Sequence, residues 1–322
     1  MNLNKLFRDE NVMLQCFTVG TAAFFYLFSR ETVGLKYYIK FLTKFNENNE
    51  PVPVENVLKF RYHNILDDMK ISEWNRKYYD LFIVKHLDPV FIGSTKTRYG
   101  IKIGIPEYFQ HGTEESIINS KILIDKKPVK WNSAEGNAFL KSLRITKDAQ
   151  KFIIAKMTNM CDSYYFLLNS LVPMLALVGY YSGCSRIYNK FKLHHRPISL
   201  TLTLHTVMGF VFIAIYVFLK DGLYFQYEKV AEDKVFNLGE SYIIGGIEYY
   251  THRIEKNKAL RNLVKNGHKY YTVGGNEMSV WRMKTLPDTY KLQLAKERLN
   301  KYSTDKELLT PPPVNPNPHP IL

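Results

Sequence analysis

The sequence has little cysteine, with three residues in a chain of 322. Cys16, Cys161 and Cys184 lie within or beside apolar runs, too far apart for a C-x-x-C or C-x-x-x-C motif. A disulfide framework needs an even set of cysteines, and thiolate zinc sites or copper chaperones need closely spaced Cys or Met ligands. We therefore predict no disulfide scaffold, no metal site and no cofactor, and interpret the thiols as small apolar side chains.

The sequence also lacks the short motifs that mark common enzyme sites. It contains no G-x-x-x-x-G-K-[ST], no H-E-x-x-H, no G-x-S-x-G and no G-x-G-x-x-G. The pair His194–His195 lies in a basic segment without Cys, Asp or Glu nearby, so we interpret it as interfacial rather than as metal ligands. Adjacent carboxylates, as at Asp67–Asp68, point apart in a helix or strand. No catalytic residue is therefore predicted, and the chain is predicted not to be an enzyme.

Charged residues are missing from two long runs, residues 163–185 and 197–219, each of 23 residues. As helices these runs would be about 35 Å long, against about 30 Å of bilayer hydrocarbon. Aromatic residues near their ends, such as Tyr164, Tyr180 and Tyr216, are typical of membrane interfaces. Buried core helices are the alternative, but such helices rarely continue this far without a charge. Residues 162–220 are therefore predicted to form a transmembrane helical hairpin.

A weaker apolar run occupies residues 11–29, where Asn11, Gln15, Thr18 and Thr21 dilute it. A cleaved secretory signal would have a basic start and a small-residue cleavage site. Here the basic residues of MNLNKLFRDE are matched by acidic ones, and no clean cleavage site follows. We predict residues 1–29 to be an uncleaved anchor that doubles as the targeting signal, with a cleaved signal as the open alternative.

The connection between the two spans, residues 186–196, is basic and has no acidic residue; its charges are Arg186, Lys190, Lys192 and Arg196. The positive-inside rule weighs short loops most, and it predicts this loop on the inner side with the soluble parts opposite. Lysines at the other ends of the spans, among them Lys36, Lys40 and Lys151, favour the reverse orientation. We adopt the first orientation.

The formal net charge of +14 is spread thinly along the chain. A nucleic-acid-binding surface would concentrate basic residues on one face or motif. Because spans are predicted, an anionic lipid bilayer explains the excess better. We predict that the chain binds no nucleic acid.

The remaining chain divides into two soluble parts and a tail. Residues 30–161 have helical spacing at VLKFRYHNILDDMKIS and strand-like patterns at DLFIVKHLDPVFIGS and YGIKIGIPEYF, which predict a mixed α/β domain. Ser133 and Thr146 are predicted N-caps, and the helix after Thr146 meets no breaker and is expected to continue into the membrane. Residues 221–309 are predicted to be helical. Residues 310–322 are rich in proline and are predicted to form a disordered tail. The predicted fold class is an α+β membrane protein.

Small and polar residues mark candidate packing positions. In the spans these are predicted to allow close contact with partner helices: Asn169, Pro173, Gly179, Gly183, His205, Gly209 and Ala214. After the spans, Gly245, Gly246 and Glu248 are candidates for close backbone approach or partner contact. An ionisable residue within a span can also mark a transport path. The alternative function is therefore a subunit of an oligomeric transporter or channel, with Asn169, Pro173 and His205 along the path.

Several segments together resemble the transmembrane protein 177 family. They are GIPEYF and VKWNSAEGNAFLKSLRITKDAQKFIIAK before the hairpin, and GGIEYYTHRIEKNKALRNLV and KYYTVGGNE after it. The resemblance covers roughly residues 100–290, and AQKF, GGIEYY and the pair Gly275–Asn276 are its most specific parts. Residues 1–99 and the proline-rich tail are not distinctive.

The resemblance implies a multi-pass protein of the mitochondrial inner membrane. It implies a non-enzymatic assembly factor that stabilises newly made cytochrome c oxidase subunit 2 and its membrane chaperone complex. Its partners would be the membrane proteins of subunit 2 biogenesis, and no catalytic residue is carried over. With the basic loop in the matrix, both soluble parts would face the intermembrane space.

Overall fold

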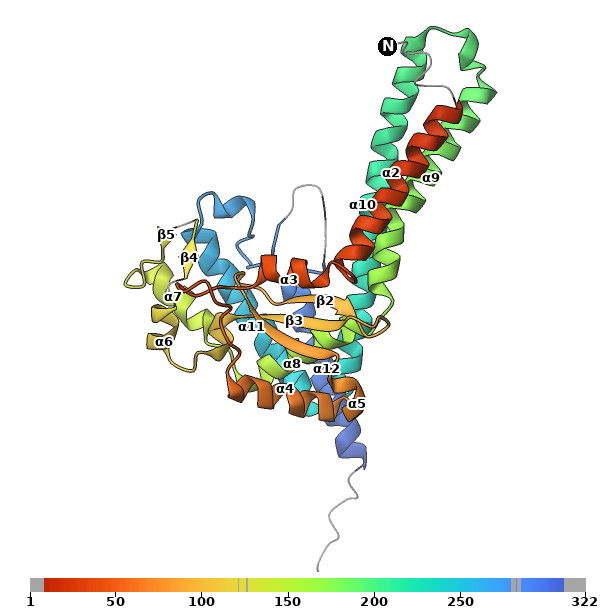
Figure 1. Cartoon of the computed structure of the whole chain (residues 1–322). Coiled ribbons are helices and arrows are strands. Elements are labelled where there is room, and N and C mark those ends of the chain that lie inside the picture. Colours follow the sequence, from red (N-terminus) through yellow and green to blue (C-terminus); the bar gives the residue numbers. More distant parts are fainter. Residues whose placement is uncertain (1–8, 121, 126, 279–281, 283–284, 310–322) are drawn as a thin grey trace, which may run out of the picture.

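The computed structural model describes residues 9–309 except 121, 126, 279–281, 283 and 284. Within that range, three helices are long and apolar enough to cross a membrane: α2 (Asp9–Arg30), α9 (Tyr165–Lys190) and α10 (Ile198–Phe236). α9 packs against both of the others, and the bundle rises from one end of a folded domain (Figure 1). The predicted α+β membrane fold, with a helical hairpin and an N-terminal span, is confirmed. Residues 1–8 of the predicted anchor and the predicted tail, 310–322, lie outside the described residues.

Helix α10 does not end with its apolar run. It has 39 residues, and at 1.5 Å per residue it is about 58 Å long, roughly twice the thickness of bilayer hydrocarbon. Lys220 and Asp221 mark the end of the uncharged run, and the helix then continues into the folded domain as far as Phe236. The third span and part of the domain core are therefore one continuous rod.

The domain contains a small mixed sheet of β1 (Tyr79–Val84), β2 (Val90–Ser94) and β3 (Gly100–Pro106), in the order β1-β3-β2. The central strand β3 pairs in parallel with β1 and antiparallel with β2. Gly93 and Gly100 have φ of +83° and +71°, and a Cβ on Gly93 would overlap the Gly100 carbonyl. Glycine is needed there because other residues tolerate that conformation poorly. A separate hairpin consists of two strands of two residues each, β4 (Leu123–Ile124) and β5 (Lys127–Pro128).

Helix α8 (Lys147–Cys161) lies at the centre of the domain and packs against α11 (Glu240–Leu263), α10 and the sheet. The other elements surround these: α3 (Leu35–Leu42), α4 (Asn56–Asp68), α5 (Glu73–Arg76), α6 (Glu114–Asn119), α7 (Ala134–Leu143), α12 (Asp288–Leu309), and the 3₁₀ turns η1 (Glu107–Gln110), η2 (Leu193–His195) and η3 (Gly267–Lys269).

The predicted helix caps are confirmed. The hydroxyl of Ser133 accepts a hydrogen bond from the backbone N–H of Gly136, and that of Thr146 accepts one from Ala149. Such caps satisfy donors that the first turn of a helix leaves free. They fix the start of α7 and the start of the central helix α8.

The expectation that α8 continues into the membrane is wrong. The helix ends at Cys161, and a new helix begins at Tyr165. The break is held by side chains: Asp162 pairs with Lys96 at 3.1 Å, and the Ser163 hydroxyl accepts from the backbone N–H of Tyr165 at 3.2 Å. Eleven of the fifteen residues of α8 are buried, so this helix belongs to the domain core and not to the membrane bundle.

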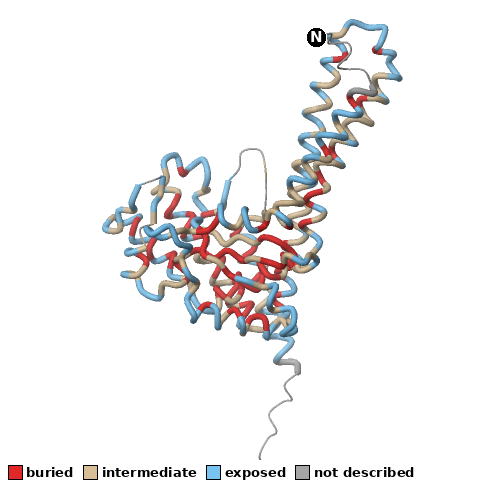
Figure 2. The backbone as a smooth tube through the Cα atoms, in the orientation of Figure 1, coloured by how far each residue is buried: buried red, intermediate tan, exposed pale blue. Residues whose placement is uncertain are grey.

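Both soluble parts of the chain contribute to one hydrophobic core. That core includes Leu58 and Ile103 from the first part, and Tyr250, Leu260 and Ala295 from the second. Figure 2 shows that buried residues concentrate in the domain, while the bundle is mostly exposed or intermediate, as expected of helices that face lipid. The predicted division at residues 29, 161, 220 and 309 stays a prediction. The domain and the end of α10 therefore form one packed body.

Candidate functional site

A buried group of charges lies where α10 enters the domain. Glu228 on α10 is 3 % exposed, and its carboxylate lies 2.8 Å from the Lys156 ammonium and 2.7 Å from that of Lys291. The Glu232 carboxylate lies 2.6 Å from Lys156 and accepts a hydrogen bond from the Tyr250 hydroxyl. We call Lys156, Glu228, Glu232, Tyr250 and Lys291 the charge network. It joins helices α8, α10, α11 and α12.

Local sequence explains this arrangement. Glu228 and Glu232 are four residues apart on a helix, so they face the same side. Lys156 lies within an apolar stretch of α8, with Ile154, Ala155 and Met157 beside it. Two ammonium groups balance two carboxylates, which limits the cost of burying them. Sequence reasoning missed the network; the available signal was a lysine inside the apolar stretch FIIAKM, together with two carboxylates four residues apart.

The network changes the acidity of its two amines in opposite directions. Burial works to lower the pKa of Lys156, but Glu228 and Glu232 outweigh it and hold the pKa well above its ordinary value. Burial lowers the pKa of Lys291, and the neighbouring Lys156 charge lowers it further, against the pull of the carboxylates. Lys156 is therefore the firmly charged centre of the network, and Lys291 is its weaker member.

A second set of ion pairs lies next to the network. Arg253 on α11 pairs with Asp288 at 3.0 Å and with Glu277 at 2.7 Å. Lys256, one turn along α11, pairs with Asp88 in the connection between β1 and β2. Although burial acts in the other direction, Lys256 and Arg253 lower the pKa of Asp88 to about 2. These contacts hold α11, α12 and the sheet in one arrangement.

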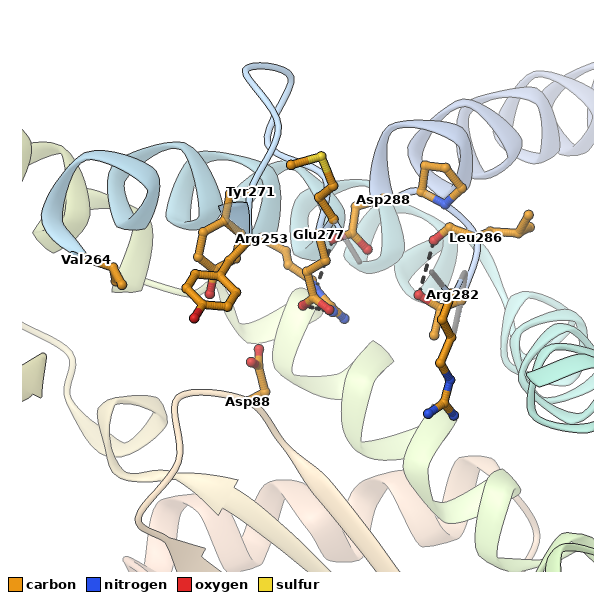
Figure 3. A pocket seen from close by; sticks show the side chains of 12 residues that line it. Asp88, Arg253, Val264, Tyr271, Glu277, Arg282, Leu286 and Asp288 are labelled. Atoms are coloured by element: carbon orange, nitrogen blue, oxygen red, sulfur yellow. Dashed lines mark hydrogen bonds and ion pairs between the residues drawn. The ribbon is translucent and has the colours of Figure 1, made fainter. Parts of the chain in front are cut away.

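The ion pairs border a cavity of about 790 Å³. Figure 3 shows Arg253 directed toward Glu277 and Asp288, with Asp88 on the opposite wall. A neighbouring cavity of about 310 Å³ shares part of this lining and reaches Tyr165 and Lys220 at the base of the bundle. Within the described part of the chain, no three His, Cys, Asp or Glu side chains are grouped closely enough to hold a metal ion. The charged residues that line the larger cavity are all engaged in ion pairs.

The predicted glycines of the spans fall into two groups. A Cβ on Gly179 would lie 2.7 Å from the Phe212 ring, and one on Gly183 would lie 2.8 Å from the Met208 methyl. These two glycines let α9 and α10 approach each other. Gly209 is different, because an added Cβ would have no atom of the described chain within 4 Å. It lines an apolar groove of about 330 Å³ between α9 and α10, with Pro173, Ala176, Leu177, Tyr180, Phe212, Ile213 and Tyr216.

The polar candidates of the spans are not brought together. His205 Nδ1 lies 2.7 Å from the Tyr180 hydroxyl, across the two helices of the hairpin. Asn169 is buried, and its side-chain oxygen has no hydrogen-bond partner among the residues that the structure describes. Asn169 and Tyr180 are eleven residues apart on α9, which is about 16 Å along the axis. Asn169 and His205 therefore lie at different depths in the bundle.

The candidates after the spans pack inside the domain. A Cβ on Gly245 would overlap the Asp148 carbonyl, and one on Gly246 would lie 2.8 Å from the Phe236 ring. The Glu248 carboxylate accepts a hydrogen bond from the Thr146 hydroxyl. These residues let α11 lie close against the start of α8.

The basic residues of the α9–α10 connection are all exposed: Arg186, Lys190, Lys192 and Arg196. They lie at the end of the bundle far from the domain (Figure 1). α2 starts near the same end. All three spans therefore leave the folded domain on one side and the basic loop on the other.

Comparison with known proteins gives one consistent result. Residues 35–286 match the model of the family described as "Transmembrane protein 177". The chain is 27% identical to transmembrane protein 177 of Homo sapiens over 272 residues, which cover 81% of this chain and 86% of the human protein. It is 26% identical to that of Danio rerio, with 84% and 86% covered, and 27% identical to that of Rattus norvegicus, with 74% and 76% covered. No solved structure matches.

Proposed function

Because this multi-pass membrane chain belongs to the transmembrane protein 177 family, we propose that it is a non-enzymatic assembly factor of the mitochondrial inner membrane. It stabilises newly made cytochrome c oxidase subunit 2 together with the membrane chaperone complex that holds it. Support comes from the family resemblance, which implies this role. Further support comes from a geometry that suits a scaffold: spans with open apolar surface, joined firmly to one folded domain.

The observation that carries the proposal is the continuity of α10. This helix presents the groove at Gly209 within the bundle and ends in the charge network of the domain. A partner with a transmembrane helix and a soluble domain on one side, such as an oxidase subunit, could contact both parts at once. Two linked contacts raise affinity through effective concentration without strengthening either contact. A rigid link also avoids the entropy cost of ordering a flexible one.

The groove is the part of the bundle that best fits a partner helix. Its lining is apolar, and Gly209 forms an open floor where a second backbone can come close. Close approach over small residues, with van der Waals packing, is what drives helix association in a membrane. Gly179 and Gly183 serve the hairpin itself, so Gly209 is the span glycine that we assign to the partner.

We place the basic loop in the matrix and the folded domain in the intermembrane space, following the positive-inside rule. Protease treatment of mitochondria and of mitoplasts, with tags at both chain ends, tests this placement. The expected result is digestion of the domain only after rupture of the outer membrane. A domain that stays protected in mitoplasts would reverse the orientation. Absence of the chain from mitochondria would contradict the proposed location.

The function is tested by isotope labelling of mitochondrial translation products in cells that carry the tagged chain in place of their own. We expect newly made subunit 2 to be recovered with the wild-type chain and to be degraded faster when the chain is absent. The Gly209→Leu variant, which fills the groove, is expected to lose most of that recovery.

Gly222→Leu is the matched control. It makes the same substitution on the same helix, beyond the apolar run, at a position that also has nothing within 4 Å of an added Cβ. If both variants recover subunit 2 like the wild type, the groove is not the contact. If the wild-type chain itself recovers none, the proposed function is wrong.

A further inference from the structure

Helix α3 carries an apolar face that the fold leaves uncovered. Tyr37 is 80 % exposed and Phe41, one turn further on, is 66 % exposed. These two aromatic side chains therefore form a stripe along one side of the helix. Val33, in the turn before α3, is exposed as well. The opposite side is buried through Leu35 and Leu42. Large apolar side chains grouped on a surface in this way mark a contact with a partner or a membrane.

The helix is fixed at the end of the first span. α2 ends at Arg30, and the turn into α3 is closed by the Ser29 carbonyl, which accepts from the N–H of Gly34 at 2.7 Å and of Thr32 at 3.1 Å. Glu31 accepts from the N–H of Gly93 at 2.8 Å, which ties this turn to strand β2. α3 therefore begins within one turn of the point where the chain leaves the membrane.

The orientation of α3 is also fixed. Leu35 and Leu42 pack with Val84 and Ile92 of the sheet in a small separate core. The Lys85 N–H donates to the Leu42 carbonyl at 3.1 Å and anchors the far end of the helix. Figure 1 shows α3 lying across the sheet on the side from which the bundle rises. Its exposed face is thereby turned away from the sheet and toward the membrane side.

The charged residues of α3 are both basic. Lys36 and Lys40 lie next to the aromatic stripe, and α3 contains no acidic residue. The Lys85 ammonium lies 4.1 Å from the centre of the Phe41 ring. Exposed residues Phe25 and Tyr26 of α2 carry the apolar surface of the span toward the same turn. A short helix with aromatics on one side and lysines beside them is the pattern of a segment that lies in the bilayer interface.

We infer that α3 is an interfacial helix that lies on an anionic lipid leaflet at the domain side of the bundle. Tyr37 and Phe41 enter the boundary between headgroups and acyl chains, and Lys36 and Lys40 contact lipid phosphates. Because α3 is pinned to the sheet, this contact sets the angle at which the folded domain stands on the membrane. The inference does not depend on the proposed function.

The test uses the full chain in lipid vesicles, with a nitroxide attached at Tyr37→Cys in a background carrying Cys16→Ala and Cys184→Ala. Collision with oxygen, which concentrates in lipid, is compared with collision with a water-soluble nickel complex. We expect the label at position 37 to be accessible to oxygen and protected from nickel. Trp74→Cys is the matched control: it is 82 % exposed, and Figure 1 places α5 at the far end of the domain.

The expected outcome is a clear difference between the labels at positions 37 and 74, two sites of nearly equal exposure. Equal, water-like accessibility at both sites would overturn the inference, since these vesicles contain no other protein to cover α3. Phe41→Cys repeats the measurement, so a single disturbed variant cannot decide it.

The contribution of the lysine charges is tested with Lys36→Gln/Lys40→Gln. Nickel accessibility at position 37 should rise in vesicles with anionic lipid and stay unchanged in neutral phosphatidylcholine, and an equal change in both would refute the contact with anionic headgroups.

Discussion

The Lys156 ammonium and the Glu228 carboxylate lie 2.8 Å apart in the interior of the domain. Lys156 belongs to α8, which is outside the membrane bundle, whereas Glu228 belongs to the helix that continues from the third span. The pair is shielded from water, so neither salt nor thermal motion of the surface weakens it much. It therefore couples the position of α10 to the domain core without a flexible linker.

The first prediction concerns this pair. Lys156→Met leaves two buried carboxylates with Lys291 alone, so it should lower the free energy of unfolding of the detergent-solubilised chain by about 3–5 kcal/mol. Denaturant titration followed by tryptophan fluorescence measures the loss. The double variant Lys156→Met/Glu232→Gln leaves one buried ammonium group, Lys291, with one buried carboxylate, Glu228. It should therefore recover part of the lost free energy of unfolding.

Lys96→Met is the control for the Lys156 variant. Its pair with Asp162 is partly exposed, and pairs of that kind contribute about 0–1 kcal/mol. Equal losses in the two methionine variants would contradict the role assigned to burial.

The second prediction concerns pH. The pKa of Asp88 is lowered to about 2 from an ordinary 3.8 by Lys256 and Arg253. As pH falls, the unfolded chain takes up the proton first, so the stabilisation is complete above about pH 4 and is lost between about pH 4 and pH 2. Half of the Asp88 side chain is open to the cavity, which reduces the effect.

Asp88→Asn should flatten the dependence of the unfolding midpoint on pH within that window. Asp80→Asn is the control, because it removes an exposed carboxylate paired with Lys102. It tests whether loss of any ion-paired carboxylate flattens the pH dependence of the unfolding midpoint. If both variants flatten the pH dependence of the unfolding midpoint equally, Asp88 is not the specific source of that dependence.

The third prediction concerns the contact of α11 with α8. Gly245→Ala places a methyl group against the Asp148 backbone carbonyl, which cannot move aside as a side chain can. We expect a loss of about 1–3 kcal/mol in the free energy of unfolding. Gly222→Ala makes the same change at an open helix position, where replacing glycine should instead stabilise by up to about 1 kcal/mol. A stabilising Gly245→Ala would show that α11 packs elsewhere.

The fourth prediction concerns the hairpin. Gly179→Ala brings a methyl group to 2.7 Å from the Phe212 ring, which must turn away. We expect α9 and α10 to separate slightly, at a cost of about 1–3 kcal/mol. The double variant Gly179→Ala/Phe212→Leu should regain stability because the smaller side chain leaves room. Additive losses in a double-mutant cycle would show that the two residues do not touch.

The features that were predicted correctly are determined by residues close together in the sequence. The span pair follows from the length of two uncharged runs, and the caps at Ser133 and Thr146 follow from hydrogen bonds that reach three residues. The end of α8 was not predicted, because the segment from Asp162 to Tyr164 contains neither glycine nor proline to mark it.

The charge network could not be predicted because its members are far apart in sequence. Lys156 and Glu228 are separated by 72 residues and by the whole hairpin. Equally, composition alone could not divide the span glycines between the hairpin and the groove. Gly179 and Gly209 are chemically identical, and only the position of Phe212 distinguishes them. Which helix covers which face is decided by tertiary packing.

The placement of Glu228 also has a consequence for membrane insertion. Lys156 precedes the hairpin in the chain, and both of its carboxylate partners follow it. Both spans of the hairpin must therefore enter the membrane, and the chain must return to the side it left, before the ammonium meets these carboxylates. A chain whose hairpin fails to insert leaves Lys156 unpaired in an incomplete core. The stability of the domain toward denaturant is thus a readout of correct insertion.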